Sequence, residues 1–325
     1  MILRSRPRRA TSLLALVCAA ALTVAIAGCS TPTDDVGPGA VTVAHKYGQT
    51  VVPADPKQVV TVGWSDQDYV LSLGIVPVAT RAWFDNYSTF PWVQKATGGQ
   101  KLDELSGDGI DFESIAKAKP DVIFAIYESI DQKTYDRLSQ IAPTVIQSAD
   151  YPDEETPWNV VLTTVGKALG KSTEADRLVQ RVQSRIDETK KAHPEFTDKV
   201  LVVNFSSDPA YYLLGTGDPR RALFDALGFA AQDTKGDVSN EKVSLLDGDV
   251  LFMNGLTKAQ LASNPSFQRL DVVSRDRTLY AGSDSVLSGA LAYGGPDALL
   301  YALDTMVPQL SNALTDKPVA DLSNA

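Results

Sequence analysis

One helical stretch decides the fold of this chain: Thr173-Glu174-Ala175-Asp176-Arg177-Leu178-Val179-Gln180-Arg181-Val182-Gln183-Ser184-Arg185-Ile186-Asp187-Glu188-Thr189-Lys190-Lys191-Ala192. Its apolar side chains recur at helical spacing, at Ala175, Val179, Val182 and Ile186. Thr173 and Asp176 form a predicted capping box at its start, and Pro194 closes it. About 20 residues at 1.5 Å per residue give a helix of about 30 Å, long enough to run from one lobe of a protein to another.

Strand-like and helix-like segments alternate on both sides of this helix. Before it we predict a hairpin around Gly48 (41–47 and 49–52), strands at 59–63, 76–81, 122–127 and 144–147, and helices at 67–73, 112–117 and 132–141. After it we predict strands at 200–205, 211–214, 250–254 and 278–281, and helices at 220–227 and 290–303. Such alternation indicates mostly parallel, buried sheets.

We therefore predict an α/β fold with two lobes, each built on a mostly parallel central sheet. Residues 41–171 form the expected N-terminal lobe, and residues 194–325 form the expected C-terminal lobe. A single long helix at 172–193 joins them, and the ligand cleft lies between the lobes. A weak internal repeat supports two related lobes, because Glu113 precedes Asp121-Val122 by the same eight positions that separate Glu241 from Asp249-Val250.

The beginning of the chain has the pattern of an export signal. Four arginines precede an apolar run at 13–27, which ends in Ile26-Ala27 and is followed directly by Gly28-Cys29. The run is about 15 residues, shorter than the roughly 20 that a membrane-spanning helix needs. We predict a signal peptide at 1–28, lipidation of Cys29 and a flexible spacer at 29–40. The expected location is the extracytoplasmic face of the cell membrane, and Arg8-Arg9 leave open whether export is general or twin-arginine.

Composition excludes several classes of function. Removing residues 1–28 takes away four arginines and moves the formal net charge from −10 to −14. This acidic balance, without a basic face, argues against nucleic acid as a partner. Cys18 lies in the signal peptide and Cys29 is the predicted lipidation site, so no disulfide is expected.

Catalytic and metal-binding patterns are absent from the sequence. The chain has two histidines, His45 and His193, and neither belongs to a recognisable catalytic motif. Two histidines without a free thiol are too few for a zinc or manganese receptor. Carboxylate pairs such as Glu154-Glu155 are interpreted as solvated loop charges. We therefore expect no catalytic residue, no metal ligand and no cofactor.

Aromatic, amide and arginine side chains follow the predicted strands, at the sheet edge where open α/β folds bind ligands. Rigid rings with a few polar tips suit a large planar or chelated ligand, and arginine suits anionic oxygens. The candidate ligand-binding residues are Trp64, Arg81, Trp83, Phe84, Tyr87, Tyr127, Phe205, Tyr212, Arg220, Arg221 and Asn254.

Five motifs carry a resemblance to a known family. They are Pro56-Lys57-Gln58-Val59-Val60, Leu73-Gly74-Ile75-Val76-Pro77-Val78, Phe112-Glu113-Ser114-Ile115 with Lys119-Pro120-Asp121-Val122-Ile123, Ile141-Ala142-Pro143-Thr144, and Glu241 with Leu245-Leu246-Asp247-Gly248-Asp249-Val250-Leu251. With these motifs the chain, over roughly residues 45–310, resembles the iron-siderophore and vitamin B12 binding proteins of bacterial ABC importers. The resemblance implies two α/β lobes joined by one stiff helix.

The resemblance also implies function and partners. It implies a monomeric lipoprotein that binds a ferric siderophore and delivers it to the permease of an ABC importer, with the iron held by the siderophore. Glu113 and Glu241 match the family's permease-docking glutamates, and Arg220 or Arg221 lies near an arginine of catecholate-binding members. The resemblance does not decide whether the siderophore is a hydroxamate or a catecholate. A heme or corrinoid ligand, with Tyr127 as the axial group for heme, is also left open. A lipid-anchored hydrolase, which would need His45 or His193, is a distant alternative, and a purely adhesive surface protein is disfavoured.

Overall fold

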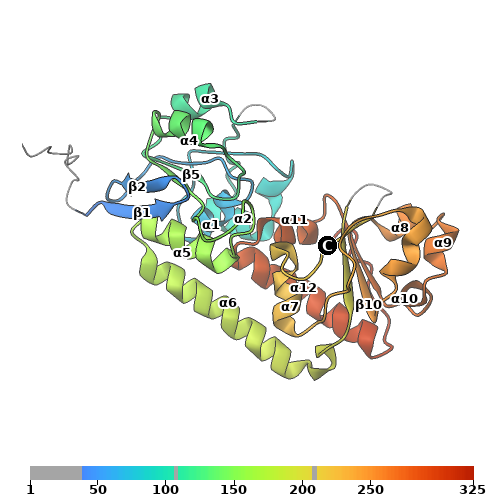
Figure 1. The fold of residues 1–325 in the computed structure, drawn as a ribbon. Helices are drawn as coiled ribbons and strands as arrows, with labels where there is room; N and C mark the ends of the chain where they lie inside the picture. The colour runs from blue at the N-terminus through green and yellow to red at the C-terminus, as the bar shows by residue number, and fades with distance from the viewer. Residues whose placement is uncertain (1–38, 106–108, 207–210) are drawn as a thin grey trace, which may run out of the picture. The chain divides into compact units, whose positions relative to one another are not determined.

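A four-stranded parallel sheet organises the first lobe (Figure 1). The structure is a computed structural model and describes residues 39–105, 109–206 and 211–325. The strands lie in the order β4 (Ala79–Thr80), β3 (Val59–Thr61), β5 (Val122–Ala125) and β6 (Thr144–Ile146), and every residue in them is buried. This burial on both faces explains why the strands read as continuous apolar runs.

Helices cover both faces of this sheet. Val122 and Phe124 of β5 pack on the side of α1 (Asp66–Ser72) and α5 (Trp158–Ala168). Ile123 and Ala125 pack on the opposite side, with Ile115 of α3 (Phe112–Lys117) and Leu138 of α4 (Gln132–Ser139). An antiparallel hairpin of β1 (Val41–His45) and β2 (Gly48–Val52) adjoins the sheet, and α2 (Pro91–Thr97) lies in the long connection after β4.

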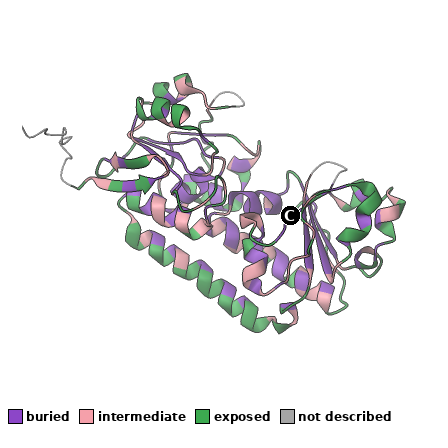
Figure 2. Cartoon of the chain, viewed as in Figure 1, coloured by how far each residue is buried: buried purple, intermediate pink, exposed green. Residues whose placement is uncertain are grey.

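The second lobe contains a five-stranded sheet. Its order is β11 (Thr278–Gly282), β10 (Val250–Gly255), β7 (Leu201–Phe205), β8 (Tyr211–Leu213) and β9 (Gly236–Val238). The first three strands are parallel, whereas β8 runs antiparallel to both of its neighbours. The prediction of two α/β lobes with mostly parallel sheets is confirmed, and Figure 2 shows both sheets as buried.

Short helices connect the strands of the second lobe. Between α6 and β10 these are η2 (Pro194–Phe196), η3 (Pro219–Arg221), α7 (Ala222–Leu227) and η4 (Asn240–Leu246); between β10 and β11 they are α8 (Lys258–Leu261), α9 (Pro265–Gln268) and α10 (Asp271–Ser274). The expected helix at 220–227 therefore begins as a 3-10 turn before it becomes α-helical. Asp218 caps this turn, because its Oδ1 accepts a hydrogen bond from the Arg220 amide at 3.0 Å.

The two copies of the sequence repeat make the same contact. Asp121, just before β5, accepts hydrogen bonds from the amides of Lys57 and Gln58 at 2.8 and 2.9 Å, at the start of the neighbouring strand β3. Asp249, just before β10, accepts a hydrogen bond from the Val200 amide at 2.9 Å, at the start of the neighbouring strand β7. In each lobe the aspartate thus aligns the beginnings of two adjacent parallel strands.

The connecting helix α6 spans Ser172–Ala192, as its apolar spacing predicts. Ala175, Val182 and Ile186 are buried, while its opposite face is exposed (Figure 2). The predicted capping box is wrong, because Lys171 is the N-cap residue and no side chain caps the helix. The helix start is instead fixed by the tight turn after α5, where the Lys171 amide donates to the Gly166 carbonyl at 2.7 Å.

The C-terminal region corrects another prediction. The single helix expected at 290–303 is two helices, α11 (Val286–Tyr293) and α12 (Pro296–Leu314). Gly294 ends α11 with a φ of 65°, a left-handed conformation that favours glycine. Pro296 then opens α12, where its missing amide hydrogen costs no hydrogen bond.

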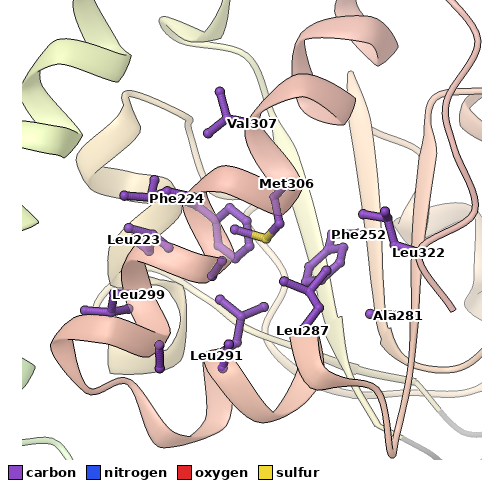
Figure 3. Close-up of a cluster of buried hydrophobic side chains, with 14 of the residues drawn as sticks. Leu223, Phe224, Phe252, Ala281, Leu287, Leu291, Leu299, Met306, Val307 and Leu322 are labelled. Atoms are coloured by element: carbon purple, nitrogen blue, oxygen red, sulfur yellow. The ribbon is translucent and has the colours of Figure 1, made fainter. Parts of the chain in front are cut away.

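The two lobes share one hydrophobic core through α11 and α12. That core joins Phe90 and Trp92 of the first lobe to Phe224 and Phe252 of the second. Figure 3 shows part of it, with Met306 of α12 beside Phe224. A Cβ on Gly289 of α11 would overlap the Phe90 ring, so the glycine permits this close approach.

A buried carboxylate lies where α1 meets these C-terminal helices. Asp68 is fully buried and accepts hydrogen bonds from the Tyr87 hydroxyl at 2.8 Å and the Trp92 indole at 2.7 Å. Nearby, the Tyr69 hydroxyl donates to the Gly294 carbonyl at 3.1 Å. Burial raises the pKa of Asp68 to about 6, although both side-chain donors oppose the shift. No described helix combines the length and apolarity that a membrane span requires.

Candidate ligand-binding site

The carboxyl ends of β3 and β5 meet at the point where the strand order of the first sheet reverses. There the Trp64 amide donates to the Tyr127 carbonyl at 3.0 Å. The buried Asp66 carboxylate accepts from the amides of Ile126 and Tyr127 at 2.8 and 3.1 Å. Burial raises its pKa to about 6 despite these donors. Asp66, which sequence analysis missed, therefore fixes the loops that present Trp64 and Tyr127.

An aromatic cluster extends from these loops. The rings of Trp64 and Trp83 lie 5.8 Å apart, and the Trp83 ring lies 5.5 Å from that of Tyr293 on α11. The Arg81 guanidinium stacks on Trp64, 3.4 Å from the ring centre, and also pairs with Glu128. Trp83 and Phe84 are half-buried, so part of each ring faces open space.

The second lobe contributes amides and one arginine. Asn204 donates from Nδ2 to the Asn254 carbonyl at 3.3 Å and accepts from the Tyr212 amide at 3.0 Å. The Ser288 hydroxyl donates to Asn254 Oδ1. The Arg220 guanidinium lies 4.8 Å from the Phe205 ring centre and 5.6 Å from that of Tyr212. These contacts hold the polar groups at the carboxyl ends of β7 and β10.

Three adjoining cavities lie along these residues. One of about 280 Å³ has walls from both lobes: Trp83, Phe84, Phe205, Ser206, Asn254, Gly255, Ser283, Ser288 and Ala292. A second, of about 660 Å³, includes Tyr127, Tyr212 and Arg220 in its lining. A smaller one of about 100 Å³ includes Tyr127, Arg220 and Tyr293. The walls of the first cavity are mostly apolar with a few amides and hydroxyls, whereas those of the second are mostly polar. Such a mostly apolar wall can enclose a bulky ligand without reacting with it.

Most of the candidate residues lie at these cavities. Trp83, Phe84, Phe205 and Asn254 line the first, and Tyr127, Tyr212 and Arg220 line the second. Trp64 and Arg81 stack on each other beside Trp83.

Two candidates are instead in the core, and their assignment to a ligand surface is corrected. Tyr87 is 5% exposed and its hydroxyl donates to Asp68. Arg221 is fully buried, donates to the Leu201 carbonyl at 2.8 Å and pairs with Asp225 at 2.7 Å. Both side chains are therefore engaged in packing within the fold.

Several lining residues were missed from the sequence. Tyr293 and Ser288 come from α11, where an apolar helix gives no local sign of a binding surface. Glu154 and Glu155, interpreted as solvated loop charges, line the cavity of about 660 Å³ together with Asp218. Only the fold shows that Glu154 and Glu155 lie near Asp218, because the loop before α5 and the loop after β8 are distant in sequence.

The two histidines have structural partners. His45 lies 3.0 Å from the Thr50 hydroxyl and 3.1 Å from the Tyr135 hydroxyl, and His193 pairs with Glu195 at 2.9 Å. Neither lines the cavities described above. Within the described ranges, no group of histidine, cysteine and carboxylate side chains is arranged to hold a metal ion.

The sequence pattern of the periplasmic binding protein family matches residues 59–284, more than half of the chain. This chain belongs to that family. A relative from Bacillus subtilis, YhfQ, is named as an ABC transporter substrate-binding lipoprotein; it is 28% identical over 296 residues, which cover 82% of this chain and 88% of the relative. YfiY from the same organism, named as a siderophore-binding lipoprotein, is 28% identical over 231 residues, which cover 65% and 67%. The protein is accordingly a substrate-binding protein and not an enzyme.

Solved structures show the same fold. A periplasmic solute binding protein from Mycobacterium smegmatis superposes with a TM-score of 0.78 at 30% identity, covering 85% of this chain and 99% of that one. PiaA from Streptococcus pneumoniae, solved in complex with ferrichrome, gives a TM-score of 0.71 at 25% identity, with the same coverage of 85% and 99%.

Proposed function

We propose that this protein is a receptor for a ferric siderophore. The observation that carries the proposal is the cavity of about 280 Å³, in which Trp83 and Phe84 of one lobe face Phe205 and Asn254 of the other. Rings from both lobes can enclose the organic part of a chelate, and the amide and hydroxyl groups can bind its oxygens. The siderophore supplies all the iron ligands, so the protein needs no cofactor.

Heme is the less favoured ligand, because the axial group expected from the sequence, the Tyr127 phenol, is poorly suited to bind iron where it lies. Burial raises the pKa of Tyr127, although the nearby Arg220 guanidinium opposes the shift. A raised pKa makes the phenolate, the better ligand for ferric iron, harder to form. The enclosed chelate is therefore favoured over direct iron ligation by the protein.

Titration of intrinsic tryptophan fluorescence tests the proposal. Ferrichrome is expected to quench the emission saturably, because Trp83 lines the cavity. The ring centre of Trp64 lies 5.8 Å from that of Trp83. Hemin, followed by absorbance in a parallel titration, is expected to give no axial-ligand spectrum. Indifference to every ferric siderophore, including trihydroxamates and catecholates, would contradict the receptor function.

Location and delivery belong to the same proposal. Cys29 and residues 1–28 lie outside the described residues, and two relatives are named as lipoproteins. We propose that lipid at Cys29 and the spacer at 29–40 hold a monomeric receptor, with lobes at 41–171 and 194–325, on the extracytoplasmic face of the membrane. Diacylation is sufficient for stable anchoring. The receptor would then deliver its ligand to the permease of an ABC importer.

Glu113 and Glu241 are the proposed contacts to the permease. Glu113 is exposed in the first turn of α3, and Glu241 is exposed in the first turn of η4. The double variant Glu113→Lys/Glu241→Lys is expected to bind the ferric siderophore with unchanged affinity but to reduce its uptake about tenfold or more, because charge reversal at an interface is strongly unfavourable.

Uptake of the radiolabelled complex by cells carrying each variant measures this effect. Glu188→Lys on the exposed face of α6 is the matched control, and its uptake should equal that of the wild type. Full uptake by the double variant would exclude these two glutamates as docking contacts.

A further inference from the structure

Carboxylates dominate the charge of the cavity walls. Asp153, Glu154, Glu155 and Asp218 line the cavity of about 660 Å³, and Asp85 and Asp284 line a further cavity of about 390 Å³ beside Trp83 and Phe84. Against these six carboxylates, the described lining of the two cavities carries two cationic side chains, Arg220 and Lys235. The described walls therefore have an excess of negative charge.

The arginines near the ligand surface are already neutralised by the protein. Arg220 forms a two-pronged pair with Asp218, from Nε at 2.9 Å and from Nη2 at 2.7 Å. Arg81 pairs with Glu128, and both of these side chains are largely buried. Both guanidinium groups thus have a carboxylate partner before any ligand arrives, and an anionic ligand would have to compete with it.

One lining carboxylate, Asp153, has a cationic partner that lies outside the described lining. Lys46 pairs with Asp153 at 2.7 Å, which leaves Glu154 and Glu155 facing the same cavity. Glu155 is exposed and Glu154 is partly buried, so their charges act on an approaching ligand through solvent and most strongly at low ionic strength.

We infer that the site selects neutral or cationic ferric chelates, such as trihydroxamates, and rejects anionic tris-catecholates. Three hydroxamates balance the charge of the ferric ion and give a neutral complex, to which a free amine adds a positive charge. Three catecholate dianions leave a trianion, which the acidic walls repel. The inference rests on the proposed function, since it names the class of siderophore that the same cavities bind.

Calorimetric titrations with three complexes test it at low ionic strength. Ferrioxamine B is cationic, ferrichrome is neutral and ferric enterobactin is a trianion. Both trihydroxamate complexes are expected to bind with an affinity at least about tenfold higher than that of ferric enterobactin. Equal or tighter binding of ferric enterobactin overturns the inference but leaves the receptor function standing. Failure of all three complexes to bind overturns the receptor function itself.

A one-charge variant locates the effect. In Asp218→Asn the amide oxygen can still cap the Arg220 turn, while the guanidinium loses its anionic partner. Affinity for ferric enterobactin is expected to rise about tenfold, with little change for ferrichrome. Asp136→Asn, which removes one exposed carboxylate from α4, is the matched control and should change neither affinity. Equal behaviour of the two variants would show that Asp218 does not set the selectivity.

Discussion

Replacing Trp83 with alanine is expected to weaken binding of the ferric siderophore about a hundredfold. Trp83 lines the cavity formed by both lobes and contacts Trp64, Phe84 and Tyr293. A large ring at the centre of a desolvated surface typically contributes about 2 to 3 kcal/mol of binding free energy. Isothermal titration calorimetry is the suitable measurement, because the variant also loses a fluorescent reporter.

The conservative variant Trp83→Phe provides the matched control. It retains an aromatic surface, so most of the affinity should return. Thermal denaturation of both variants separates lost binding from lost folding, which is needed because the half-buried Trp83 ring packs against the shared core. An alanine variant with native stability and unchanged affinity would show that the ligand binds elsewhere.

The second large effect concerns stability and pH. The free energy of unfolding of the wild type is expected to fall by about 3 kcal/mol, relative to that of Asp68→Asn, between about pH 4 and pH 7. The pKa of Asp68 is raised to about 6 in the folded protein, well above the value of an unfolded aspartate. Between these two pKa values the folded protein holds more protons than the unfolded chain. Stability is therefore lost as the pH rises through this window and changes little above it.

The comparison with the asparagine variant isolates this carboxyl group. Asparagine can accept the hydrogen bonds from Tyr87 and Trp92 but has no proton to lose in this range. Titration of Asp66 and His45 occurs in both proteins, so it cancels in the difference. Urea denaturation at a series of pH values measures the effect. A constant difference between wild type and variant across the series would mean that Asp68 does not titrate in the window.

The secondary structure was predicted best where local chemistry decides it. The helix expected at 112–117 is α3, because the Asp111 side chain caps its first turn by accepting hydrogen bonds from the amides of Glu113 and Ser114. The long helix was predicted from its apolar spacing, but its start was not, because the turn after α5 fixes it through backbone contacts. The break between α11 and α12 had a local signal in Gly294-Gly295-Pro296, which the apolar run on either side obscured.

The sequence predicts which strand ends carry the candidate site, but it does not predict the direction in which each side chain points. Trp83, Phe205 and Asn254, selected because they follow predicted strands, line one cavity. Neighbours in sequence face different ways, however: Arg220 lines a cavity, whereas Arg221 is buried against β7. Which of two adjacent residues faces a ligand depends on a rotation of about 120° per residue along this 3-10 turn, and only the packed fold determines where the turn begins.

The shared core changes what counts as a domain in this chain. Phe90 of the first lobe packs on Gly289 of α11, and Phe252 of the second lobe lies in the same core as α12. Both helices follow residue 284, where the family pattern ends. The part of the chain that forms either sheet is therefore not a complete folding unit without α11 and α12. The two lobes are expected to melt in a single cooperative transition.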